Sequence, residues 1–281
     1  MLLEVPMSVS GTLIVRRCCE GGKGSDGHIQ YLCQDDVAPR LSPFILVKTL
    51  KNIPSCRDFT IVGGEPLLYK DEILEIVKEI ACTNIRTIII TNAVLLTSDF
   101  IDKIKNYNIH FVFSIDTIDK GFWKFVRGCD SFDLVMNNLK EAFYKLTSCQ
   151  MSIQSVLAKE TAPYIEKVKE FAEKQGLYHS IQNYVQEGFE GNWTPIKCKT
   201  NTMIETGQQC FAAGRNLSIM QNGNVTTCFQ QQLIGGFEMP LGNLHTDSIT
   251  TILESVYIKK VIDAMKSCNR SCRVLKCNLK R

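Results

Sequence analysis

The sequence has no long apolar run and almost no excess charge, and each absence excludes a class of protein. No stretch reaches the roughly 18 uninterrupted apolar residues that a membrane helix needs, so we expect no membrane segment. The net charge of +3 on 281 residues provides no electrostatic basis for binding nucleic acid or an anionic membrane. The first part of the chain lacks the basic segment of a secretory signal, which predicts a cytoplasmic protein.

Cysteine, in contrast, is abundant, with thirteen copies in the chain. An odd number without a recognisable secretory signal favours metal ligation over a disulfide framework. Four cysteines occur singly in or near core-like stretches, where we expect small buried apolar side chains: Cys56, Cys82, Cys129 and Cys149. The remaining cysteines gather toward the two ends of the chain.

Short apolar segments alternate with amphipathic helical patterns over the first two thirds of the chain. Strands are expected at residues 12–17, 59–62, 87–90, 110–115, 152–157 and 178–186, and helices at residues 42–50, 71–80, 98–105, 132–146 and 164–176. Each expected strand is almost continuously apolar, which favours a parallel α/β sheet buried on both faces. Periodicity alone leaves open whether this sheet is open, a partial barrel or closed.

The C-terminal third of the chain has a different pattern. Residues 188–209 show no sustained period and are expected to form a linker. Asn222-Gly223 lies between apolar segments at 217–220 and 225–229, which predicts a tight β-hairpin. An apolar stripe over residues 249–265 predicts one amphipathic helix. We therefore expect a division of the chain into residues 1–187, 188–209 and 210–281.

A turn at the end of the second expected strand is a candidate ligand site. The strand at 59–62 runs directly into Gly63-Gly64-Glu65-Pro66. Two glycines allow backbone atoms to approach a ligand closely, and the carboxyl ends of parallel strands are where ligands bind in such sheets. Glu65 would be an ionised group placed to receive a cationic partner such as an amino group. The alternative is an ordinary strand-to-helix turn.

Two clusters of cysteines are candidate metal sites. Five cysteines flank the expected hairpin and follow the last helix, and thiolates brought together in this way suit zinc or an iron–sulfur cluster: Cys210, Cys228, Cys268, Cys272 and Cys277. Free thiols in a disordered tail are the alternative. Three others follow the first strand and should lie at the same sheet edge as the Gly63–Pro66 turn: Cys18, Cys19 and Cys33. Because the side chains of adjacent cysteines diverge, we expect one of Cys18 and Cys19 to be the better placed. His28 and Asp36 are possible additional ligands.

These motifs, in this order, resemble the radical S-adenosylmethionine (radical SAM) superfamily, in the branch with a C-terminal auxiliary-cluster extension of the SPASM or twitch type. Gly63-Gly64-Glu65-Pro66 resembles the motif that holds the methionine amino group of the cofactor. Thr91-Asn92-Ala93 is similar to a Thr-Asn-Gly strand end, with alanine in place of glycine, and Ser114-Ile115-Asp116 is similar to a segment that lines the cofactor pocket. Cys210 and Cys228, with Gly223 between them, resemble the opening of the auxiliary domain.

The resemblance implies a parallel (β/α)6-type partial barrel with a small C-terminal hairpin and helix that bind metal. It also implies that S-adenosylmethionine and one or more [4Fe–4S] clusters are the cofactors. The residues that it assigns to cofactor binding are Gly63, Gly64, Glu65, Pro66, Asn92, Ser114, Asp116, Arg127 and Val156. The metal ligands that it implies are Cys18, Cys19, Cys33, Cys210, Cys228, Cys268, Cys272 and Cys277.

One departure from the family pattern concerns the catalytic cluster. Most members carry Cys-x3-Cys-x2-Cys after the first strand, whereas fourteen residues separate Cys18 from Cys33 here, and Asp36 stands where the last cysteine would be. Some members have long first spacings or an Arg-Cys-Cys start like Arg17-Cys18-Cys19. The departure is compatible with an unusual ligand set, in which Cys18 or Cys19, Cys33 and a third donor hold the cluster, and also with a decayed site.

The activity implied by the resemblance is reductive cleavage of S-adenosylmethionine to start a radical modification of a ribosomal peptide or a protein side chain. The partners would be that substrate and an electron donor such as flavodoxin or ferredoxin. Three alternatives remain. One is transfer of the 3-amino-3-carboxypropyl group, another is a non-catalytic scaffold that keeps only the C-terminal cluster, and the third is a zinc protein.

Iron content separates the enzyme from the scaffold. If both cysteine clusters hold a [4Fe–4S] centre, anaerobically purified protein should contain about eight iron atoms per chain and a Cys33→Ala variant about four. Cys82→Ala removes a cysteine outside both clusters and should leave the iron content unchanged. Equal iron in the wild type and the Cys33→Ala variant would support the scaffold.

Overall fold

The computed structural model describes residues 7–12, 40–53, 56–62, 65–184, 193, 194, 196, 213–228 and 236–266. Six parallel strands carry the first part of the fold: β1 (Met7–Thr12), β2 (Cys56–Val62), β3 (Arg86–Thr91), β4 (Ile109–Ser114), β5 (Met151–Leu157) and β6 (Tyr178–Asn183). Three shorter strands follow: β7 (Asn216–Ile219), β8 (Asn224–Thr226) and β9 (Gly242–Asn243). All nine form one sheet in the order β6-β5-β4-β3-β2-β1-β7-β8-β9.

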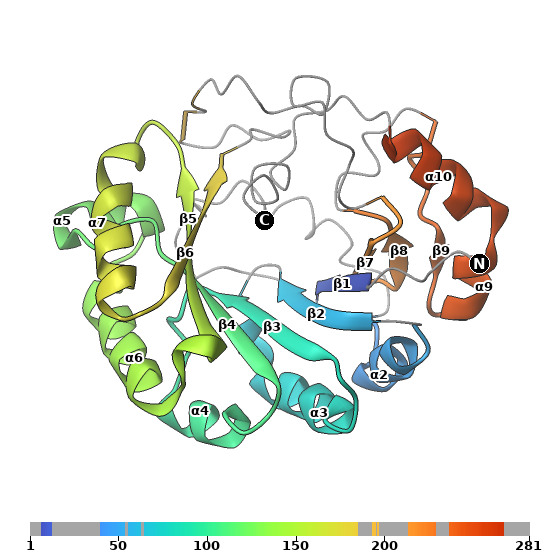
Figure 1. The fold of residues 1–281 in the computed structure, drawn as a ribbon, viewed down its shortest axis with the longest axis horizontal. Helices are drawn as coiled ribbons and strands as arrows, with labels where there is room; N and C mark the ends of the chain where they lie inside the picture. Colours follow the sequence, from blue (N-terminus) through green and yellow to red (C-terminus); the bar gives the residue numbers. More distant parts are fainter. Residues whose placement is uncertain are drawn as a thin grey trace.

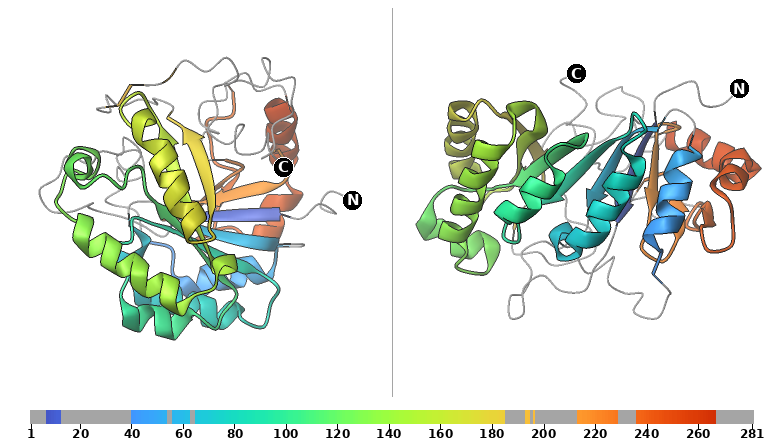
Figure 2. Two further views of the ribbon diagram at one scale, coloured as in Figure 1. Left: turned by 60° about the vertical axis from the view of Figure 1, so that its left-hand side comes forward. Right: turned by 90° about the horizontal axis from the view of Figure 1, so that it is seen from below.

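The sheet curves, and its helices lie along the outer, convex side (Figure 1). These are α2 (Pro43–Lys51), α3 (Lys70–Ile80), α4 (Ser98–Ile104), α5 (Lys120–Arg127), α6 (Phe132–Lys145) and α7 (Ala162–Lys174). Two further helices, α9 (Ile249–Glu254) and α10 (Val256–Lys266), lie beyond the β7–β8 hairpin at the other end of the sheet (Figures 1 and 2). Short 3₁₀ helices at Pro66–Tyr69 and Ser148–Gln150 complete the described elements.

The two faces of the sheet differ in burial, as the period-2 alternation of strands requires. On β2 to β4 the odd-numbered residues pack under the helices, and Phe59, Ile89, Phe111 and Phe113 are fully buried. The even-numbered residues face the concave side and are mostly half-buried. The apolar core therefore lies between the sheet and its helices, and the concave side is left for more polar groups.

The β7–β8 hairpin continues the barrel sheet because β7 pairs in parallel with β1, with Ser8 opposite Asn216 and Gly11 opposite Ile219. Its turn depends on Gly223, whose φ of 84° is in the left-handed region. The Asn243 amide clamps the same turn by donating to the Asn222 carbonyl at 3.0 Å and to Asn224 Oδ1 at 2.9 Å. The hairpin is thus fixed both to β1 and to β9.

The fold class predicted from the sequence, a parallel partial barrel with a hairpin and helical extension, is confirmed. Two details were wrong. The expected first strand at residues 12–17 overlaps the described strand, Met7–Thr12, only at Thr12, and residues 13–17 lie outside the described part. The serines and the glycine of Met7–Thr12 have low strand propensity, so residues 7–11 were not predicted as strand. The predicted single helix over 249–265 is two helices, because Ser255 takes an extended conformation with ψ 148°.

Other features were missed or misplaced by the sequence reasoning. Helix α5 and the short strand β9 were not predicted. Cys82 and Cys149 are exposed, and Cys56 and Cys129 are half-buried, so the expected set of buried cysteines is wrong. They lie at helix and strand ends, where apolar neighbours in sequence do not imply burial. Among the described helices, none combines the length and the apolar character that crossing a membrane requires.

Gly223 provides a test of the hairpin. A Cβ atom there would lie 2.7 Å from His245 Cδ2 and 2.8 Å from Asn243 Oδ1, so Gly223→Ala adds a clash to the left-handed strain. Gly176 has a similar φ of 66° but no atom within 4 Å of its Cβ position, so Gly176→Ala adds the strain alone.

We expect Gly176→Ala to lower the free energy of unfolding by about 1 kcal/mol and Gly223→Ala by about 2–4 kcal/mol, as measured by chemical denaturation. Equal losses in the two variants would contradict the clamped turn.

Candidate functional site

Glu65 lies at the end of β2 and joins that strand to the end of β3. Its Oε1 accepts hydrogen bonds from the Leu67 backbone N–H at 3.0 Å and from the Thr91 hydroxyl at 2.6 Å. Its Oε2 accepts from the Asn92 backbone N–H at 2.9 Å. The bond to Leu67 caps the 3₁₀ helix Pro66–Tyr69, which turns the chain away from the sheet. The carboxyl group is therefore held from three directions.

The electrostatics of Glu65 favour a cationic ligand. The residue is only 4% exposed, and burial raises the pKa of its carboxyl group although the bonds from Thr91, Asn92 and Leu67 act against this. A carboxylate offers about four acceptor positions, of which the three bonds occupy two on Oε1 and one on Oε2. The remaining position on Oε2 could accept a bond from an ammonium group, which would also favour the ionised form.

Ala93 keeps the turn next to Glu65 in a conformation that usually belongs to glycine. Its φ of 62° makes it the one non-glycine residue with positive φ in the described part of the chain. Its N–H donates to Thr91 Oγ1 at 3.0 Å, and the Asn138 amide donates to its carbonyl at 2.9 Å. These bonds hold the strained backbone, so alanine preserves the turn in place of the glycine of the family motif.

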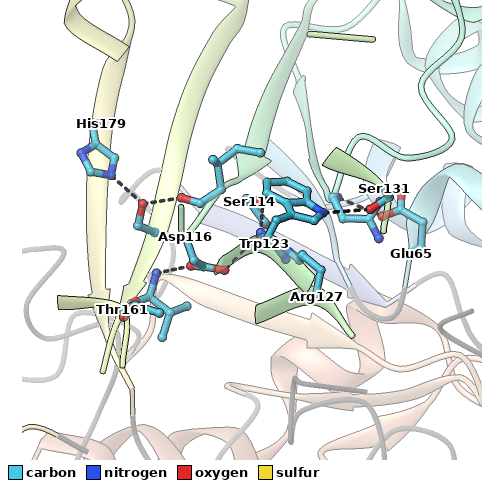
Figure 3. Close-up of polar contacts among 12 residues, drawn as sticks. Glu65, Ser114, Asp116, Trp123, Arg127, Ser131, Thr161 and His179 are labelled. Carbon is cyan, nitrogen blue, oxygen red and sulfur yellow. Dashed lines mark hydrogen bonds and ion pairs between the residues drawn. The ribbon is translucent and has the colours of Figure 1, made fainter. Parts of the chain in front are cut away.

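A second buried group lies at the ends of β4 and β5. Asp116, which is 4% exposed, accepts from the Val156 backbone N–H at 2.7 Å and forms an ion pair with Arg127 at 3.1 Å. Arg127 also donates to the Ser114 carbonyl. Figure 3 shows the side chains of Asp116 and Arg127 directed toward each other. The ion pair fixes the geometry of this sheet edge.

Helix α5 places Arg127. Asp119 caps its start by accepting from the Phe122 N–H at 2.9 Å, and Gly128, with φ 70°, ends it directly after Arg127. The guanidinium carbon of Arg127 lies 5.6 Å from the centre of the Trp123 ring, whose N–H donates to Ser131 Oγ at 3.1 Å. The cation is thus positioned by its own helix.

The edge formed by β5 and β6 is fixed by hydroxyl groups. Ser155 donates to the Ile115 carbonyl at 2.5 Å, so His179 Nε2, 2.8 Å away, must donate to Ser155 Oγ. Burial lowers the pKa of His179, which favours the neutral ring, and the bond to Ser155 then places its proton on Nε2. Thr161 donates to the Val156 carbonyl at 2.6 Å. Figure 3 shows His179 at one end of this row of polar contacts and Glu65 at the other.

The structure brings the described members of the predicted site into two groups. Glu65, Pro66 and Asn92 form one, and Ser114, Asp116, Arg127 and Val156 form the other. Asn92 and Val156 donate their backbone N–H groups to Glu65 and Asp116, and the side-chain oxygen of Asn92 accepts from the Val94 N–H at 2.9 Å. Outside the described residues lie Gly63, Gly64, Cys18, Cys19, Cys33, His28, Asp36, Cys210, Cys268, Cys272 and Cys277, and also Cys198, to which the sequence reasoning assigned no role.

The sequence reasoning missed Trp123 and Thr161, and it named Thr91 only as part of the Thr91-Asn92-Ala93 motif, without a role. The role of Thr91 could have been found, because a hydroxyl at the end of a strand beside a buried carboxylate is a natural donor. Trp123 and Thr161 carry no such signal, because their roles depend on an unpredicted helix and on a loop that folds back on β5.

The described residues contain one of the proposed metal ligands, Cys228, which follows β8 and is half-buried. No group of three or more potential ligands gathers in that part of the chain. Burial and the nearby Asp58 raise the pKa of Cys56 to about 12, so this cysteine is a thiol and not a metal-binding thiolate.

Comparison with known families identifies the class of protein. Residues 43–182 match the model of the radical SAM superfamily, and residues 210–278 match the SPASM iron–sulfur cluster-binding domain. Together these segments cover most of the chain, which belongs to the radical SAM superfamily and carries a SPASM domain. The cofactors of this class are S-adenosylmethionine and [4Fe–4S] clusters, as the sequence resemblance predicted.

Individual relatives are more distant. A probable GTP 3′,8-cyclase of Sulfurisphaera tokodaii is 29% identical over an alignment of 211 residues that covers 63% of this chain and 67% of that protein. Streptococcus suis SuiB bound to S-adenosylmethionine superposes with a TM-score of 0.72 at 15% identity, over 100% of this chain and 75% of that one. The enzyme anSMEcpe with bound S-adenosylmethionine and a peptide has a TM-score of 0.69 at 16% identity, over 93% and 84%. These two likenesses concern the fold.

The Asp116–Arg127 pair can be tested through stability. Asp116→Asn leaves the buried Arg127 without its counter-charge. The new amide group also turns its N–H toward either Arg127 or the Val156 N–H. The free energy of unfolding should therefore fall by about 3 kcal/mol. Asp99→Asn removes an ion pair with Lys103 whose side chains are 73% and 54% exposed, and should change stability by less than about 0.5 kcal/mol.

Both variants are compared by denaturant unfolding of the apoprotein. Similar small losses in both would mean that Asp116 and Arg127 do not depend on each other.

Proposed function

We propose that this protein is a radical SAM enzyme that cleaves S-adenosylmethionine reductively and modifies a peptide substrate. The observation that carries the proposal is the Glu65 carboxyl group, buried, held by three donors and left with one acceptor position. That arrangement fits the amino group of the methionine moiety. A scaffold that had lost its cofactor would have no need to keep a buried carboxyl group with a raised pKa.

The residues that would hold the cofactor lie along one sheet edge. Glu65 would bind the amino group beside Gly63, Gly64 and Pro66, with the Asn92 N–H keeping the carboxylate in place. The Asp116–Arg127 pair, the Ser114 carbonyl and the Val156 backbone would shape the pocket for the rest of the molecule. The described contacts among these groups hold them in place without a ligand, which would preorganise the pocket.

The iron–sulfur cluster, when bound, supplies the electron that breaks a C–S bond of S-adenosylmethionine. Cys18 or Cys19, Cys33 and a third donor would hold it, and an electron donor such as flavodoxin or ferredoxin would reduce it. The auxiliary cluster would be held by four of the five C-terminal cysteines, Cys210, Cys228, Cys268, Cys272 and Cys277. We accordingly propose residues 1–187 as the barrel, 188–209 as a linker and 210–281 as the auxiliary domain.

A peptide is the substrate that we favour. Two of the structures that share this fold contain a peptide, the precursor peptide SuiA in SuiB and the Kp18Cys peptide in anSMEcpe. The SPASM domain lies in the same sheet as the barrel, so the substrate would be enclosed between β6 and the C-terminal unit, and water would be excluded.

The proposal predicts the product and its dependence on Glu65. Anaerobically reconstituted protein, given reductant and S-adenosylmethionine, should release 5′-deoxyadenosine. Glu65→Gln removes the charge that pairs with the amino group and should weaken the affinity for S-adenosylmethionine about 10- to 100-fold. Glu79→Gln is at a surface site where the glutamate side chain is 61% exposed. It should leave the release of 5′-deoxyadenosine and the affinity for S-adenosylmethionine unchanged.

Methylthioadenosine in place of 5′-deoxyadenosine would indicate 3-amino-3-carboxypropyl transfer instead. An enzymatic role would be contradicted if neither product is released and no metal is bound at Cys18, Cys19 and Cys33.

A further inference from the structure

The concave side of β5 and β6 carries a row of neutral polar side chains. Ser114 lies opposite Gln154, Gln154 opposite Ser180, and Val156 opposite Gln182 in the strand register. Ile153 and Ser155, which alternate with Gln154 and Val156, are fully buried on the helix side. Because successive side chains on a strand point to opposite faces, Gln154 and Gln182 lie on the face away from the helices.

The two carboxamides are available for a ligand. Both residues are half-buried, and neither side chain has a hydrogen-bond partner among the described residues. Neighbouring strands are about 4.8 Å apart, and Gln182 is offset from Gln154 by two residues along the strand direction. Each carboxamide offers two donor hydrogens and one acceptor oxygen. The pair therefore presents donors and acceptors side by side without charge.

Charges on this side of β2 to β6 are already paired. Arg86 forms an ion pair with Asp58 at 2.9 Å near the beginning of the strands, and Arg127, from α5, pairs with Asp116 at the other end. Burial lowers the pKa of His110, which favours its neutral form, and the ring contacts the Cys149 carbonyl and Ser152 Oγ. Arg57 lies on the opposite face of β2, so the concave face of these described strands offers no unpaired cation to bind a phosphate group.

We propose that Gln154 and Gln182 bind an amide group of the substrate and select an uncharged peptide segment over a nucleoside triphosphate. This inference rests on the proposed function, since it assigns the substrate contact of the same barrel. A carboxamide is the natural partner of a peptide group, because each supplies an N–H donor and a C=O acceptor. The relative described as a probable GTP 3′,8-cyclase would then differ from this chain in substrate class.

Equilibrium dialysis of the reconstituted holoenzyme with S-adenosylmethionine tests the inference. The probes are a mixture of N-acetylated, C-amidated tetrapeptides of uncharged residues and, separately, GTP, each quantified by mass spectrometry. Gln154→Leu and Gln182→Leu keep the side-chain volume but remove the amide. Gln175→Leu, at an exposed site after α7, is the matched control.

We expect the wild type and the Gln175→Leu variant to bind peptides, and to bind GTP at least tenfold more weakly than they bind peptides. Each of the other variants should lose about three- to tenfold in peptide affinity, with unchanged affinity for S-adenosylmethionine. GTP binding as tight as peptide binding, or an equal loss of S-adenosylmethionine affinity in the variants, would overturn the assignment. Release of 5′-deoxyadenosine by a wild type that binds no peptide would overturn it too, but would leave the proposed function standing.

Discussion

The buried carboxyl group of Glu65 is the constraint on which the rest of the site depends. Removing a carboxylate from water is costly unless donors replace the lost solvation. Thr91 and the backbone N–H groups of Leu67 and Asn92 do so here, and they come from the ends of two neighbouring strands and from the helical turn after Glu65. The parallel pairing of β2 with β3 is therefore what makes the charge tolerable, and the cofactor site follows from the sheet.

A second constraint is the pairing of β7 with β1. It makes the hairpin that leads to Cys228 part of the barrel sheet and not a separate appendage. The clamped turn at Gly223 then sets the direction of β8, which runs antiparallel to β7. Since β7 lies between β1 and β8, β8 runs antiparallel to β1, and Cys228 follows the end of β8 that lies opposite to the C-terminal end of β1.

Continuous apolar strands separated by strong helical stripes predicted the parallel α/β sheet, and the family resemblance supplied the partial barrel. Glu65 was found because it follows such a strand, whereas Asp116 was assigned through the resemblance. Sequence reasoning failed where local preference and tertiary pairing differ. The first strand, with Ser8, Ser10 and Gly11, is held by β2 on one side and β7 on the other, and not by its own propensity. Helix α5 has eight residues and lies between two turns, so its period was too short to recognise.

The central claim is that Glu65 is a buried carboxyl group whose ionisation is completed by a cationic ligand. Because the pKa of this carboxyl group is raised in the folded protein, the free energy of unfolding should fall as the pH rises through that pKa. Ligand binding should restore the lost stability. The most direct test is to follow the ¹³C carboxyl shift of Glu65 against pH in the apoprotein, with and without S-adenosylmethionine. We predict a pKa above 4.5 without ligand and a clear fall when the ligand is added. An ordinary pKa that does not respond to S-adenosylmethionine would contradict the account.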